Sequence, residues 1–120
     1  MSQELKDRTK LFAKSCIHLL RSVKSNDKLF WHVERQLLRC ATSVAANYRA
    51  ANLAQSKAAF VAKLSIVVEE ADECIFWLEL LYEEGLITEN QAKPVIKESR
   101  ELTAIFVAAR KTAANRSNNP

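Results

Sequence analysis

Residues 56–85 read SKAAFVAKLSIVVEEADECIFWLELLYEEG, and this stretch decides the fold. Its apolar side chains recur at steps of three and four, which places them along one face of a long amphipathic helix. The only glycine of the chain, Gly85, follows at once, as glycine does just past the end of a helix. The seam predicted for this helix consists of Phe60, Leu64, Val67, Ala71, Cys74, Leu78 and Leu81.

The same spacing predicts three more helices. One covers about residues 3–24, another covers about residues 28–54 and can be capped by Asn26 or Asp27, and a last one opens with a capping box of Thr88 and Gln91. Pro94 should bend this last helix or delay its start. In chain order, the predicted seams are Leu5, Thr9, Phe12, Cys16, Leu19 and Val23; then Phe30, Val33, Leu37, Cys40, Val44, Asn47 and Ala51; and finally Val95, Ser99, Leu102, Phe106, Ala109 and Ala113.

Four amphipathic helices with short connections predict an all-α, antiparallel up-down four-helix bundle. The 120 residues provide for one domain, which we expect over residues 1–114, with the polar residues 115–120 as a disordered tail. No apolar run approaches the ~20 residues needed to cross a bilayer. The first residues are charged, unlike a signal peptide. We therefore expect a cytoplasmic protein that does not associate with membranes.

The chain lacks the residue patterns of the common catalytic and metal-binding sites. Cys16, Cys40 and Cys74 are odd in number and widely separated, which is typical of small buried side chains and not of disulfide or zinc frameworks. His18 and His32 lack the glutamate three residues earlier that a di-iron bundle uses. A single glycine cannot form a phosphate-binding loop. We expect no enzymatic activity, no catalytic residue, no cofactor and no metal.

Charge is distributed unevenly along the chain. Residues 55–87 carry seven acidic and two basic side chains, whereas the segments on either side are basic. The helix over residues 28–54 carries a basic stripe, which could be a solvated face, could pair with acidic side chains of a neighbouring subunit, or could bind phosphates. If it binds nucleic acid, the expected contacts are Lys28, Arg35, Arg39 and Arg49, with Lys57 and Lys63 as secondary ones.

The helices also carry more apolar surface than one seam requires. This surplus indicates either a wide core face or an interface between subunits, because large apolar patches are rare on monomers. Asn47 falls on a predicted seam, where a buried amide can fix register and subunit number or can simply be a satisfied core amide. The predicted oligomer interface consists of Trp31, Leu38, Asn47, Tyr48, Trp77 and Tyr82.

Three separated blocks carry a family resemblance. Residues 38–51 read LRCATSVAANYRAA, residues 60–81 contain FVAKLSIV, EEADEC and WLELL, and residues 104–112 read AIFVAARKT. With these blocks, over about residues 12–113, the chain resembles the four-helix-bundle family encoded in intervening sequences of bacterial 23S ribosomal RNA genes.

The resemblance implies a left-handed bundle that assembles into a homopentameric ring. A similar ring is built by the accessory protein of diversity-generating retroelements, which is basic and works with nucleic acid and a reverse transcriptase. The family has no established activity, and nucleic-acid binding is its usual proposal. Leu53 and Gln55 replace arginines common in this branch, which weakens the expected phosphate binding.

The expected function is therefore a homo-oligomeric ring, pentameric by this resemblance, that binds RNA or DNA independently of sequence. The alternative is an adaptor ring that docks an unknown protein partner and does not need nucleic acid.

Overall fold

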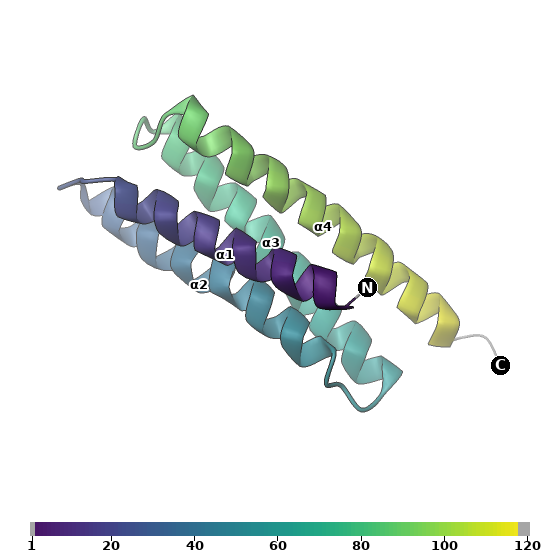
Figure 1. Cartoon of the computed structure of the whole chain (residues 1–120). Helices are drawn as coiled ribbons and strands as arrows, with labels where there is room; N and C mark the ends of the chain where they lie inside the picture. Colours follow the sequence, from purple (N-terminus) through teal and green to yellow (C-terminus); the bar gives the residue numbers. More distant parts are fainter. Residues whose placement is uncertain (1, 118–120) are drawn as a thin grey trace.

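The computed structural model of the protein describes residues 2–117. Over this range the chain forms four α-helices joined by short connections. They are α1 (Ser2–Ser22), α2 (Lys28–Ala51), α3 (Lys57–Glu83) and α4 (Glu89–Ser117). Successive helices run antiparallel and form an elongated bundle of 56 × 23 × 20 Å (Figure 1). The prediction of an all-α antiparallel four-helix bundle is confirmed.

The four helices do not pack against one another equally. α3 lies closely along both α2 and α4, whereas α1 packs mainly on α2 and makes far fewer contacts with α4. The first turn of α1, the last turns of α4 and the α2–α3 connection lie at one end of the bundle (Figure 1). α1 has 21 residues and α4 has 29, so α4 is not covered by α1 along its whole length.

The core follows the predicted seams closely. Every predicted seam residue of α3 from Leu64 to Leu81 is buried, and Phe60 is half-buried. Two polar seam positions are also buried and are satisfied by backbone carbonyls. Thr9 donates to the carbonyl of Leu5 at 2.8 Å, and Ser99 donates across to the carbonyl of Ala71 on α3 at 2.8 Å.

The predicted seam of α2 is wrong at one position. Tyr48, not Asn47, enters the core, where it is 1% exposed and its ring centroid lies 5.0 Å from that of Phe106. After Val44 the seam takes a step of four and not of three. Both steps fit a helix, and burial of the larger ring area favours Tyr48 at the core position.

The predicted caps are confirmed, whereas α1 ends at Ser22 and α2 at Ala51, somewhat earlier than the expected residues 24 and 54. Asp27 accepts a hydrogen bond from the backbone N–H of Leu29 at 2.8 Å and caps α2. Gly85, with φ at 73°, follows the end of α3 in the left-handed conformation that glycine adopts without strain. Thr88 and Gln91 form the reciprocal capping box of α4, with distances of 2.8 and 3.1 Å.

The end of the chain differs from the expectation. Pro94 lies inside α4, which begins at Glu89, so the proline does not delay the start of this helix. The helix also continues to Ser117 and thus includes residues 115–117 of the expected tail. Residues 118–120 lie outside the described part of the chain. Within residues 2–117 no helix is both long and apolar enough to cross a membrane.

Candidate functional site

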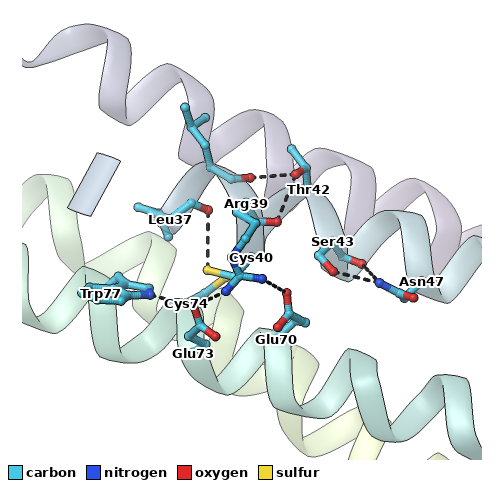
Figure 2. Close-up of polar contacts among 11 residues, drawn as sticks. Leu37, Arg39, Cys40, Thr42, Ser43, Asn47, Glu70, Glu73, Cys74 and Trp77 are labelled. Atoms are coloured by element: carbon cyan, nitrogen blue, oxygen red, sulfur yellow. Dashed lines mark hydrogen bonds and ion pairs between the residues drawn. The ribbon is translucent and has the colours of Figure 1, made fainter. Parts of the chain in front are cut away.

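The outer surface between α2 and α3 is held by one arginine and two carboxylates. The guanidinium of Arg39 reaches from α2 to α3, where it pairs with Glu70 at 2.7 Å and also with Glu73 (Figure 2). Glu73 accepts a second hydrogen bond, at 2.9 Å, from the indole N–H of Trp77. The cluster therefore crosslinks the two helices above their buried seam.

The ionisation of this cluster follows from these contacts. The hydrogen bond to Glu73 is the main reason that the pKa of Arg39 is raised. Partial desolvation would raise the pKa of Glu73, but the hydrogen bonds from Trp77 and Arg39 outweigh it, so the pKa of Glu73 is lowered. Arg39 and Glu73 are thus both charged at neutral pH, and Arg39 is engaged within its own chain.

The remaining cations of the predicted stripe are exposed. Lys28, Arg35 and Arg49 on α2 form no ion pair with any residue between 2 and 117, and the same holds for Lys57 at the start of α3. Lys63 is half-buried. Among the predicted phosphate contacts, Arg39 is the one whose charge is already balanced by neighbouring carboxylates.

The residues predicted for the oligomer interface fall into three groups. Trp31 and Tyr82 are 46% and 43% exposed and are free to meet another surface. Leu38 and Trp77 are half-buried beside the core, and the ring of Trp77 contacts those of His32 and Phe76. The third group consists of Asn47 and Tyr48.

Tyr48 is a correction, because it is buried in the core of the protomer and cannot form part of an interface. Its hydroxyl is also the only buried side-chain nitrogen or oxygen without a hydrogen bond in the described part of the chain. Asn47 is half-buried, and its amide donates to the carbonyl and hydroxyl of Ser43 within α2, at 3.0 and 2.8 Å (Figure 2). It is a satisfied amide beside the core.

The three cysteines are buried in the core, as predicted, and are free. The sulfurs of Cys40 and Cys74 lie 3.1 Å apart between α2 and α3 (Figure 2). Burial raises the pKa of Cys16 to about 12, and the contact with Cys40 together with burial raises the pKa of Cys74. Such thiols stay protonated at neutral pH and are weak nucleophiles, so they serve packing.

The carboxylates of α3 do not form a metal site. Glu70 and Glu73 face Arg39, while Glu69 and Asp72 are exposed to solvent. No group of three histidine, cysteine or acidic side chains in residues 2–117 is arranged to hold a metal ion. A groove of about 790 Å³ is lined by Tyr82 of α3 and by Pro94 and Ile96 of α4, among others.

The family model of the 23S rRNA-intervening sequence protein matches residues 2–108, which is most of the chain. The chain belongs to the 23S rRNA-intervening sequence protein family. A solved structure agrees with this assignment: a protein of unknown function from the S23 ribosomal protein family of Bacteroides thetaiotaomicron VPI-5482 is 34% identical, with a TM-score of 0.83. The match covers 92% of this chain and 99% of that one. Among curated proteins, none matches this sequence.

Membership in the 23S rRNA-intervening sequence protein family confirms the resemblance carried by the three sequence blocks. The first block lies on α2 and contains Arg39, Cys40, Ser43 and Asn47, all drawn in Figure 2. Their contacts are structural. Arg39 forms an ion pair with α3, Cys40 packs in the core against Cys74, and Asn47 donates a hydrogen bond to Ser43 within α2. These four residues of the block therefore serve the packing of α2, while Arg49 of the same block is exposed on its surface.

Two cations that the sequence did not single out lie close to the predicted stripe. Lys6 and Lys10 of α1 line the same groove as Arg49 of α2. Their spacing of four residues places both on one side of α1, which is a signal visible in the sequence. That this side faces Arg49 depends on the packing of α1 against α2. A third omission is Phe76, which is 56% exposed on α3.

Proposed function

We propose that the protein is a non-enzymatic subunit of a homopentameric ring that binds RNA or DNA through its phosphates, independently of sequence. The observation that carries this proposal is the separation of charge between faces of the bundle. Exposed cations without an ion-pair partner within residues 2–117 lie on α1, α2 and α4, among them Lys10, Arg49 and Lys97, whereas α3 has one such cation, Lys57 in its first turn. The surface of α3 carries the exposed carboxylates Glu69, Asp72 and Glu83. Basic side chains that cluster apart from an acidic face are typical of nucleic-acid binding.

Exposed aromatic rings support the assembly part of the proposal. Trp31 on α2 and Phe76 and Tyr82 on α3 each expose more than two fifths of their surface. Aromatic side chains of this kind are enriched at interfaces between proteins. The resemblance to the family, which implies a ring, supports the same assembly. A ring would present several copies of one weak basic surface, and multivalency would raise the overall affinity.

The decisive experiment combines light scattering with a binding titration. Labelled RNA and DNA of unrelated sequence are titrated at several salt concentrations, and the mass of the assembly is measured at micromolar protein. The expected result is an oligomer whose affinity falls steeply with salt, with a log–log slope of about −0.9 per phosphate neutralised on duplex DNA. Affinity should be similar for unrelated sequences, because phosphate contacts carry no sequence information.

A matched pair of variants isolates the basic stripe. The change Arg35→Glu with Arg49→Glu should weaken binding to every sequence, whereas Lys97→Glu with Lys111→Glu on α4 makes the same change in charge and should weaken it much less. All four side chains are exposed. A correctly assembled ring that does not bind nucleic acid even at low salt would eliminate this function and leave the adaptor that docks a protein. A mass of one chain would eliminate the ring.

A further inference from the structure

The groove between α1 and α2 is the part of the basic surface best built to receive a polyanion. It has a volume of about 550 Å³ and is lined on the α1 side by Lys6, Asp7 and Lys10 and on the α2 side by Thr42 and Arg49. The two helices run side by side here, near the first turns of α1 (Figure 1). Cations therefore stand on both walls of a single groove.

We infer that this groove is the phosphodiester-binding site of the protein, and this inference rests on the proposed function. The charge of the groove is positive, because Lys6, Lys10 and Arg49 face a single acid, Asp7. The hydrogen bond at 3.0 Å that Asp7 accepts comes from the neutral amide of Gln3. None of the three cations forms an ion pair within the described chain. Their charges remain available to a ligand.

The rest of the groove lining explains why the ligand should be a backbone and not a base. It includes the small side chains of Ala13, Ala45 and Ala46, which allow a chain of nucleotides to approach closely. The hydroxyl of Thr42 donates to the carbonyl of Leu38 in its own helix at 2.7 Å. With the amide of Gln3 and the hydroxyl of Thr42 engaged, the side-chain donors left to meet a ligand are the three cations, which recognise phosphates without reading sequence.

The alternative occupant of the groove is the acidic face of α3 from a second copy of the chain. Interfaces between subunits usually centre on aromatic and large apolar anchors. The groove holds no such anchor, and the exposed rings of Trp31, Phe76 and Tyr82 do not line it. A phosphate backbone therefore fits the lining of the groove better than a protein surface does.

The test compares two variants that each lose three positive charges. The groove variant carries Lys6→Gln, Lys10→Gln and Arg49→Gln. Its control carries Lys24→Gln, Lys97→Gln and Lys111→Gln, which are exposed positions outside the groove. The probe is a labelled uridine 20-mer, titrated at several salt concentrations. Both variants are checked by light scattering and circular dichroism, so that a loss of assembly or of folding is seen directly.

The groove variant should bind the probe at least about tenfold more weakly than the control variant at the same salt. Its log–log salt slope should fall by about 2 for each engaged subunit, from about 0.7 per lost phosphate contact on a single strand. Equal binding by the two assembled variants would show that the groove is not the phosphodiester-binding site, while leaving the proposed function intact. A groove variant that no longer assembles would identify the groove as a subunit interface. A wild-type ring that fails to bind would remove both proposals.

Discussion

Two arginines each link a pair of helices through ion pairs, but the packing between the two helices differs from one pair to the other. Arg39 ties α2 to α3 through Glu70 and Glu73, and Arg8 ties α1 to α4 through Glu98 and Glu101. The first pair of helices shares a buried seam in which Cys40 touches Cys74. The second pair makes few contacts along its length, and Arg8 supplies the main polar link between its helices.

The comparison shows that equal ion pairs do not have equal structural consequences. Between α2 and α3 the buried apolar area would hold the helices together without Arg39, since burying that area stabilises the pair more than a solvent-exposed ion pair does. Between α1 and α4 there is less such area, so α1 should be the helix that opens most easily. The basic groove lies against this helix, which couples the least tightly held part of the bundle to the candidate binding surface.

The largest expected effect comes from cavities in the tightly packed half. Leu37→Ala on α2 and Leu78→Ala on α3 remove fully buried side chains, and each should lower the free energy of unfolding by about 2–5 kcal/mol. Leu5→Ala, in the first turns of α1 at the rim of the core, should cost clearly less. Urea unfolding followed by circular dichroism, at one fixed protomer concentration, gives all three values.

Equal losses of unfolding free energy for the alanine variants of Leu37, Leu78 and Leu5 would contradict the difference between the two helix pairs. They would mean that α1 is held as tightly as α2 and α3 and that its few contacts with α4 do not matter for stability.

A second, smaller effect concerns the sulfur contact between α2 and α3. The sulfurs of Cys40 and Cys74 touch at 3.1 Å. The losses of unfolding free energy caused by Cys40→Ala and Cys74→Ala should therefore not be additive, and a double-mutant cycle should give a coupling of about 0.5–1 kcal/mol. The control cycle joins Cys40→Ala with Leu5→Ala, which lies far along the bundle in the first turns of α1. Coupling as large in the control cycle would show that the effect is not local to the α2–α3 seam.

Much of the fold could be predicted because it depends on spacing within single helices. The seam of α3 and the caps at Asp27, Thr88 and Gln91 are local in sequence, and all of them are confirmed. The choice between Asn47 and Tyr48 could not be made this way, since both fit the period of a helix. It was decided by packing against Phe106, which is far away in the chain.

The surface chemistry was harder to predict, because it depends on contacts between helices and not on spacing within one helix. The sequence places Arg39 in the basic stripe of α2, where a solvated face, pairing across subunits and phosphate binding are all open. In the structure it pairs with Glu70 and Glu73 of its own chain, and that pairing depends on the register of α2 against α3. Lys6 and Lys10 join Arg49 only when α1 packs antiparallel to α2. The types of charge were readable from the sequence, and their partners were not.

A third prediction compares the two arginines directly. Arg8→Gln should lower the melting temperature by about 2–5 °C, which corresponds to about 1 kcal/mol for a chain of this size. Arg39→Gln should lower it less, because the seam beneath it remains. Hydrogen exchange should show faster exchange of α1 amides in Arg8→Gln and no comparable change in α2 for Arg39→Gln. A larger loss in Arg39→Gln would reverse the assignment of the weaker helix pair.

The smallest effect is the pH dependence of the two clusters. The hydrogen bond from Arg8 is the main reason that the pKa of Glu98 is lowered, and the pKa of Glu73 is lowered as well. A carboxylate whose pKa is lower in the folded than in the unfolded chain contributes stability above its ordinary pKa of about 4.3, and this is lost as pH falls through the folded value. The gap in melting temperature between wild type and Arg8→Gln should therefore narrow as pH falls below about 4.3.

The difference in melting temperature between wild type and variant should narrow by different amounts for Arg8→Gln and Arg39→Gln. In Arg39→Gln, Trp77 still donates to Glu73, so part of the lowering of that pKa survives. In Arg8→Gln, Glu98 loses the arginine that supplies the first of its stabilising contacts. Melting curves recorded at low salt, from neutral pH to below about 4.3, should thus show the stronger narrowing of the melting-temperature difference for Arg8→Gln. A gap that stays constant with pH would mean that Arg8 acts through the packing of its aliphatic stem on the bundle and not through its carboxylate partners.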